Sequence, residues 1–260
     1  MKVGLRVRMT RLASVCLCLV LLLVWEAWVQ HQGISALVLP APSQIGITLW
    51  RGLASGYLLG HMQQTLFELC WGLLAGCVLG FVGGVVLAEL EGLRRIVMPY
   101  VMTSQVVPKL ALAPLFIVWF GFGTLPTVVM TGLICFFPLL ENTATCMQQV
   151  DAQRLELFRM LRATSWQTLW RLKIPAGLPH IMAGLRVAVV LAWVGAVVGE
   201  FIGGSKGLGA LIIAAQGSMD TPLMFAVLVL ITALGILSYS GVQALERRFS
   251  PSSPLTSLKV

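Results

Sequence analysis

Charged side chains inside long apolar stretches include Glu68 early in the second stretch and Glu141 near the end of the fourth, and three others have types and positions that could serve chemistry on a polar solute. These three are Lys109, Arg186 and Glu200. A charge in hydrocarbon is costly, so such a residue faces protein or water and often marks the path of an ion or solute. The alternative is that these residues form ion pairs within the fold or extend their charged ends to a membrane surface. The first interpretation predicts a translocation pathway.

The local sequence favours a cavity at the first of these residues. Lys109 directly follows Pro108, and Pro114 comes shortly after it. Each proline frees a backbone carbonyl in the preceding helical turn, and within a membrane that carbonyl must face protein or water. Arg186 and Glu200 are separated by about four helical turns, which places them on one face of a helix.

Catalytic and metal-binding sites are not predicted. The three histidines, 31, 61 and 180, stand apart from any nucleophile, and the six cysteines form no C-x-x-C pair. The only aspartates are Asp151 and Asp220, so paired aspartates of a membrane protease are absent. We therefore expect a chain that is not an enzyme and holds no metal.

The composition indicates how these residues are positioned. The chain has 260 residues, of which 58% are hydrophobic and 11% charged. Apolar runs of about 20 residues recur, and each can cross a bilayer as a helix that satisfies its own backbone. We predict an all-α polytopic membrane protein with six transmembrane helices, and a surface helix that ends near Gly60 after the first of them. The predicted spans are about 12–29, 64–88, 97–120, 125–146, 178–200 and 222–245.

The basic residues predict the orientation of these spans. The net charge is +8, and most Lys and Arg fall before the first span, after the second, in segment 147–177 and after the last. Basic loops remain in the cytoplasm, so both termini are predicted there, and the charge does not indicate nucleic-acid binding. Residues 1–11 form a basic N-terminus, 12–248 the transmembrane domain, and 249–260 a Ser/Pro-rich disordered tail. Because no convincing small-x-small cleavage site follows the first span, we interpret it as a retained anchor rather than a signal peptide.

Glycines are spaced for close helix packing in the second span. Gly72, Gly76 and Gly80 recur every four residues, and Gly83 and Gly84 follow. Residues four apart share a helix face, where glycine lets another backbone approach closely. We expect this face to be buried in protein, either as a static seam or as one that slides.

A second glycine-rich stretch, Gly203–Gly207, lacks the spacing of a nucleotide-binding Walker A motif. It is predicted to be a turn on the outer side of the membrane. If ATP drives this protein, another chain must bind the nucleotide.

The segment 147–177 is the longest polar stretch. Residues 151–163 can form a short helix, and Thr164 with Gln167 fits a capping box that begins a second helix. We expect this second helix to end at Pro175. Two short helices outside the bilayer predict a docking surface, and a membrane-surface hairpin without a partner is the alternative.

This segment resembles the cytoplasmic coupling loop of ABC-importer permeases, whose pattern is Glu-Ala-Ala-x-x-x-Gly followed by Ile/Val/Leu-x-Pro. Glu156 matches the glutamate, and Ala163, Trp166 and the stretch Leu172–Pro175 also agree. Leu157 and Phe158 replace the alanines, and Arg162 replaces the glycine. The resemblance implies contact with an ATPase through Glu156, Leu157, Phe158, Arg159, Met160, Leu161, Arg162, Ala163 and Thr164.

Further segments resemble the nitrate/sulfonate/taurine branch of these permeases, namely Leu39–Ser43, Val107–Gly123 and Gly199–Gly203. The segment Gln105–Lys109 is also similar to relatives thought to carry pyrimidine vitamin precursors or other heterocycles. The resemblance implies a type I ABC importer permease fold in the bacterial inner membrane. The candidate pathway residues are then Gln105, Lys109, Arg186, Trp193 and Glu200.

The resemblance also implies partners and cargo. Two cytoplasmic ABC ATPases would bind ATP and Mg, so this chain would bind no cofactor itself. A periplasmic or lipid-anchored substrate-binding protein, a second permease copy in a homodimer, and membrane lipid complete the expected assembly. The expected cargo is a small anion or organic solute such as nitrate, sulfonate or taurine, with a heterocycle as the alternative. An ATP-independent transporter or channel subunit and a membrane scaffold are the competing hypotheses.

Overall fold

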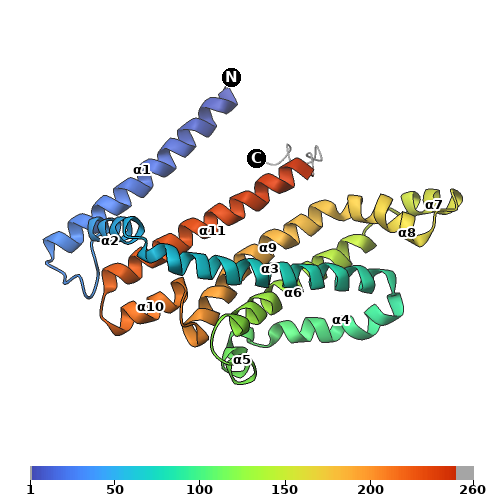
Figure 1. Cartoon of the computed structure of the whole chain (residues 1–260). Coiled ribbons are helices and arrows are strands. Elements are labelled where there is room, and N and C mark those ends of the chain that lie inside the picture. The colour runs from blue at the N-terminus through green and yellow to red at the C-terminus, as the bar shows by residue number, and fades with distance from the viewer. Residues whose placement is uncertain (1, 250–260) are drawn as a thin grey trace. The chain divides into compact units, whose positions relative to one another are not determined.

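The computed structural model describes residues 2–249, and every element among them is a helix (Figure 1). The description leaves out residues 1 and 250–260 and the side chains of 2–12, 15 and 249. The side chains of the predicted basic N-terminus and of the predicted disordered tail therefore lie outside the described residues. The elements are α1 Lys2–His31, α2 Pro42–Ala54, α3 Tyr57–Glu89, α4 Glu91–Val106, η1 Lys109–Leu112, α5 Ala113–Phe120, α6 Thr124–Gln148, α7 Ala152–Met160, α8 Ser165–Thr168, η2 Leu169–Lys173, α9 Ile174–Gly203, α10 Leu208–Gly217 and α11 Thr221–Phe249.

Four helices are long and apolar enough to cross a membrane, and a bent pair can form a fifth span. The four are Tyr57–Glu89, Thr124–Gln148, Ser165–Gly203 and Thr221–Arg248. The bent pair is Glu91–Val106 with Lys109–Phe120. These five correspond to the second to sixth predicted spans. The first predicted span lies in α1, whose described apolar part, Cys16–His31, is shorter than the others.

The chain divides into two compact units. One comprises Met1–Gly60 with Leu211–Ile231, and the other comprises His61–Ala210 with Thr232–Val260. In the first unit, α1 holds the start of α2 through Glu26, whose carboxylate accepts hydrogen bonds from the Ser43 backbone N–H at 2.9 Å and its hydroxyl at 2.7 Å. Carboxylates favour helix N-termini in this way. The surface helix that was predicted to end near Gly60 corresponds in sequence to α2, which ends at Ala54.

In the second unit, α6 lies between the glycine faces of α3 and α9. A Cβ added at Gly76 would overlap the carbonyl oxygen of Gly132, and one added at Gly72 would lie 2.5 Å from the Thr131 Cβ. From α9, a Cβ at Gly195 would lie 2.9 Å from the Cα of the same Thr131. The expectation that the α3 glycine face is buried in protein is confirmed. The α9 glycine face was not predicted.

The predicted proline interruption appears as a sharp bend in the third predicted span. Its two halves, α4 and η1–α5, meet at 84° on either side of Pro108. The first half packs on the C-terminal part of α6, where Met98 and Val101 join Leu140 and Ala144 in one buried cluster. The bend brings polar residues at 105–109 against the same helix.

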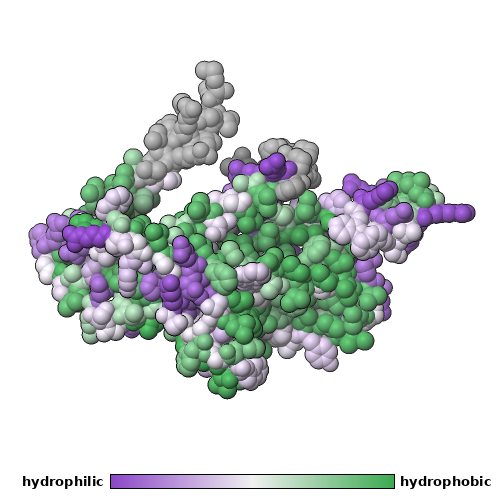
Figure 2. Space-filling view, viewed as in Figure 1, coloured by the Kyte–Doolittle hydropathy of each residue, from purple (hydrophilic) through white to green (hydrophobic). Residues whose placement is uncertain are grey.

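Apolar side chains cover much of the surface visible in Figure 2. On α3, for example, Leu74 is 55% exposed and Leu79 is 63% exposed. A soluble protein would bury such side chains, whereas lipid solvates them. The exposed face of these helices is therefore of the kind that contacts hydrocarbon.

Candidate functional site

The loop between α6 and α9 consists of two capped helices. At the start of α7 the Asp151 carboxylate accepts a hydrogen bond from the Gln153 N–H at 3.0 Å. At the start of α8 the Gln167 N–H donates to the Thr164 hydroxyl at 3.2 Å, and the Thr164 N–H donates to the Gln167 Oε1 at 2.9 Å. This reciprocal pair is the predicted capping box.

The turn that ends α7 places Arg162 in the left-handed region, with φ of 52°. The Ala163 N–H donates to the Phe158 carbonyl at 3.0 Å, and the Arg162 N–H donates to the Arg159 carbonyl at 2.9 Å. These two bonds define a Schellman motif, in which the left-handed position is usually glycine. Arg162 therefore takes the conformation of the glycine it replaces in the coupling-loop pattern.

Apolar side chains are exposed at the end of α7. Met160 is 81% exposed and Leu161 is 69% exposed, while Leu157 is 54% exposed and Phe158 is half-buried. The α7–α8 region appears beside hydrophilic side chains at one extremity of the second unit (Figures 1 and 2). An exposed apolar group among charged neighbours is typical of a surface that contacts another protein.

The expectation that the second helix of the loop ends at Pro175 is wrong. Residues Ser165–Gly203 form one continuous helix. The π-helical turn Leu169–Lys173 precedes the proline, and the Ile174 N–H donates to the Leu169 carbonyl. This turn shifts the hydrogen-bond register by one residue, and Pro175 enters in the first turn of α9, where a missing N–H is tolerated.

Two contacts fix the loop to the spans. The Lys173 Nζ lies 2.6 Å from the Glu89 carboxylate at the end of α3. Leu169 is buried in a cluster with Leu139 and Met147 of α6. These contacts connect the loop to α3 and α6, and the chain continues directly from it into α9.

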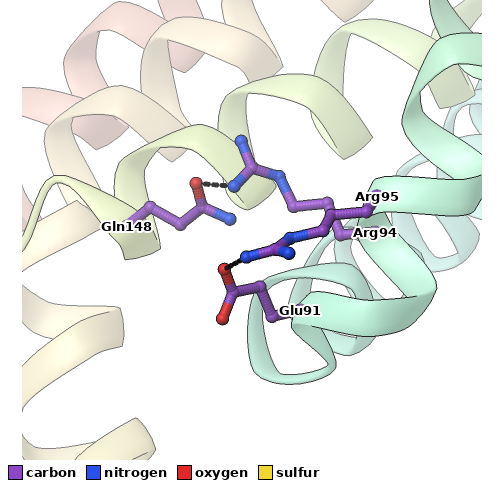
Figure 3. Close-up of polar contacts among 4 residues, drawn as sticks. All are labelled: Glu91, Arg94, Arg95 and Gln148. Atoms are coloured by element: carbon purple, nitrogen blue, oxygen red, sulfur yellow. Dashed lines mark hydrogen bonds and ion pairs between the residues drawn. The ribbon is translucent and has the colours of Figure 1, made fainter.

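The same end of α6 also contacts the beginning of α4 (Figure 3). The Arg94 guanidinium donates a hydrogen bond to the Gln148 side-chain oxygen, and Arg95 forms an ion pair with Glu91 at 2.7 Å. The Arg95–Glu91 pair is exposed and contributes little stability. Arg94 therefore links α4 to Gln148, the last residue of α6 before the α7–α8 loop.

The bend brings two predicted pathway residues together. The Gln105 Nε2 donates to the Glu141 carboxylate at 3.0 Å, and the Lys109 Nζ lies 4.2 Å from the centre of the Phe137 ring. Phe137 and Glu141 are four residues apart on α6 and so share a face. This cluster of one cation, one carboxylate, one amide and one aromatic ring could bind a small polar solute. Phe137 was not predicted, because an aromatic residue in an apolar span carries no distinguishing pattern.

The other three candidates lie along α9 in separate surroundings. The Arg186 guanidinium lies 3.3 Å from the Glu246 carboxylate, as the ion-pair alternative expected. Trp193 is 6% exposed, and Gly235 of α11 lies against its ring. Glu200 is 1% exposed. In the part of the chain that the structure describes, none of these three side chains forms an ion pair or a cation–π contact with Lys109.

The surroundings of Glu200 explain the glycine-rich turn. The Gly209 N–H donates to its Oε2 at 2.6 Å. A Cβ added at Gly207, which has φ of 134°, would overlap the Glu200 carboxyl group. Only glycine allows the backbone to close around this carboxyl. Thr65 and His61 of α3 hold the same turn, because the Leu208 N–H donates to Thr65 and the His61 ring contacts Gly207.

Known proteins are similar to this chain over most of its length. The riboflavin transport system permease protein RibX of Chloroflexus aurantiacus is 36% identical over 88% of this chain and 85% of its own length. The formylaminopyrimidine transport permease protein ThiX of Halalkalibacterium halodurans is 35% identical, with coverage of 90% and 92%. The putative aliphatic sulfonates transport permease protein SsuC of Bacillus subtilis is 34% identical, with coverage of 88% and 83%.

A solved structure of the MetNI methionine ABC transporter in an inward-facing conformation has the same fold. It aligns with a TM-score of 0.65 and 20% identity, over 74% of this chain and 96% of the matched chain. Residues 72–251 match the family described as binding-protein-dependent transport system inner membrane component. The chain therefore belongs to the family of inner membrane components of binding-protein-dependent transport systems, and it is a multi-pass permease subunit with the type I ABC importer fold.

Proposed function

We propose that α7 and α8 are the docking site for a cytoplasmic ABC ATPase, which supplies ATP and Mg to a permease that binds neither. The observation that carries this proposal is the apolar end of α7, fixed by a Schellman turn and followed by one unbroken helix, Ser165–Gly203. Because the helix that begins in the loop is also a span, movement of the ATPase reaches the membrane without a flexible joint. Coupling then requires contacts that differ between the two states of the ATPase.

The proposed assembly contains two copies of this permease, two ATPases and an outer substrate-binding protein. Both termini and the α7–α8 loop face the cytoplasm, in accord with the basic residues around them. The Gly203–Gly209 turn faces the binding protein.

Substitutions in α7 test the docking proposal. We expect Met160→Asp to weaken co-purification with the ATPase by about tenfold or more, because a carboxylate replaces an apolar contact at an interface. Glu156→Ala should retain ATP hydrolysis but lower the cargo moved per ATP. Val38→Asp is the control, since Val38 is exposed to a similar degree, 75%, in the turn between α1 and α2. Normal ATPase binding and normal transport in both α7 variants would contradict the proposal.

For the cargo, we propose a small organic anion such as a sulfonate or taurine. Among the residues that the structure describes, Lys109 forms no ion pair, and its ammonium group lies at the bend of the third predicted span. A cation held there can neutralise a sulfonate group during passage. The sulfonate permease SsuC is one of the similar proteins.

A heterocycle is the second candidate, favoured by a different observation. Glu141 and Gln105 supply an acceptor and an amide beside the Phe137 ring. Such a set can accept hydrogen bonds from ring N–H groups and stack on a planar ring. Riboflavin and formylaminopyrimidine are named as the cargo of two similar proteins.

A further inference from the structure

Glu68 of α3 and Glu200 of α9 form a buried pair of acidic side chains. Each residue is 1% exposed. Thr65, one helical turn before Glu68 on α3, accepts a hydrogen bond from the Leu208 N–H, and the next residue, Gly209, donates to Glu200, so the two glutamates meet at the same turn. Two ionised carboxylates in contact repel each other, and burial removes the water that would screen the repulsion. The pair therefore needs a positive charge that the two side chains do not supply.

Each carboxyl group has one satisfied oxygen and one unsatisfied oxygen. The Gln64 Nε2 donates to the Glu68 Oε1 at 2.7 Å, and the Gly209 N–H donates to the Glu200 Oε2 at 2.6 Å. Within residues 2–249, the Glu68 Oε2 and the Glu200 Oε1 have no hydrogen-bond partner. A buried oxygen without a donor is costly, so two of them in neighbouring carboxyl groups point to a missing hydrogen.

Amide, hydroxyl and imidazole side chains surround the pair. From α3 comes His61, whose ring contacts the Gly207 backbone, and from α6 come the hydroxyl-bearing Thr124 and Thr127. The glycine turn carries Lys206, which is exposed and is not paired with either glutamate, and the turn reaches Glu200 through the Gly209 N–H. In the part of the chain that the structure describes, neither glutamate forms an ion pair with Lys or Arg.

We propose that Glu68 and Glu200 hold a single proton between them. The protonated carboxyl becomes a donor to its neighbour, and an O–H···O⁻ bond of this kind is short and strong. The remaining negative charge is stabilised by the Gln64 amide and the Gly209 N–H. A second negative charge is disfavoured because Glu200 lies in the last turn of α9, where the free helix carbonyls are themselves partly negative.

The shared proton connects α3 to α9 and to the glycine turn that encloses Glu200. A divalent metal ion fits the site less well, because the described residues contain no group of three His, Cys, Asp or Glu side chains. Raising the pH until the proton leaves would put two charges in one buried site and separate the helices. The proton assignment needs no ATPase and no cargo, so it stands or fails independently of the proposed transport function.

Infrared difference spectroscopy of the purified full chain in lipid nanodiscs tests the assignment. Spectra at neutral and alkaline pH, in sodium-free buffer, should show one protonated-carboxyl C=O band that disappears at alkaline pH. Glu68→Gln and Glu200→Gln should each lack the band, because the new amide donates to the remaining carboxylate without a proton. Glu26→Gln is the matched control and should retain the band, since Glu26 already receives two hydrogen bonds from Ser43.

Thermal unfolding of the same samples gives a second readout. Wild type should lose stability as the pH rises and the proton leaves, whereas either glutamine variant should lose this dependence. Absence of the band in wild type, or its persistence in both glutamine variants, would overturn the proposal. A wild-type chain without the band that is stabilised by added sodium would instead hold a metal ion, which also overturns it.

Discussion

Arg162 occupies the position of the usual glycine in the coupling-loop pattern, and the turn that ends α7 still forms. Its left-handed φ of 52° is unfavourable for a side chain with a Cβ. The two hydrogen bonds of the Schellman motif offset that strain, so the loop keeps its form with an additional positive charge on its surface. The arginine side chain is exposed beside Met160 and Leu161, where an ATPase would contact it.

Arg162→Gly should stabilise the α7–α8 loop by about 1 kcal/mol, because glycine adopts the left-handed conformation without strain. Hydrogen exchange of the α7 backbone amides measures this as slower exchange. Ala163→Gly is the matched control, because the φ of Ala163 is not positive and glycine relieves no strain there. This change only raises the conformational entropy of the unfolded chain, so the α7 amides should exchange faster. Faster exchange in Arg162→Gly would show that the arginine side chain, and not the turn, maintains the loop.

At the scale of elements, α3, α4 and α9 pack on α6 within the second unit. Glycine faces of α3 and α9 approach it from two sides, with Thr131 between Gly72 and Gly195. Such close approach lets backbones pack without bulky side chains, which is a favoured mode of association in membranes. A methyl group added at Gly72, Gly76 or Gly195 would therefore overlap atoms of α6.

Gly76→Ala should lower the stability of the chain by roughly 1–3 kcal/mol or prevent folding, because the new Cβ meets the Gly132 backbone, which cannot rotate away. Gly241→Ala in α11 is the control, since nothing lies within 4 Å of its added Cβ. That control should be neutral or slightly stabilising. Thermal unfolding in detergent compares the two. Equal stability would mean that α3 and α6 are not in this contact in the membrane.

At the scale of the whole molecule, two features are separate in the chain and have separate proposed roles. The α7–α8 loop offers a protein contact, and the bend at Lys109 offers a polar cluster within a span. Neither feature alone defines an importer. Family membership and fold place both features in one importer permease.

Uptake into proteoliposomes that contain the whole transporter separates the two candidate cargoes. If the cargo is a sulfonate, Lys109→Gln should reduce its uptake by about tenfold, which corresponds to the loss of one charge interaction of about 1.4 kcal/mol. Uptake of formylaminopyrimidine by wild type would favour the heterocycle instead. Arg248→Gln, which changes an exposed arginine near the end of α11, is the control. Unchanged sulfonate uptake in Lys109→Gln would exclude a direct role for this lysine.

The sequence by itself determined the features that depend on residues close together along the chain. Apolar runs predicted the helices, Thr164 and Gln167 predicted a cap, and Pro108 predicted an interruption, since each depends on neighbours within a turn or two. The coupling-loop assignment also came from a local pattern. The prediction for Pro175 failed because a π-helical turn just before it kept the helix continuous.

Only the tertiary structure decided which residues meet across the fold. Glu68 and Glu200 are 132 positions apart, and no spacing in the sequence predicts that their carboxyl groups share one buried site. The same holds for Lys109 with Phe137, for Arg186 with Glu246 and for the α9 glycines against α6. Apolar helices have similar sequences on their lipid-facing and protein-facing sides, so their partners are set by steric fit and by the pairing of the few polar groups.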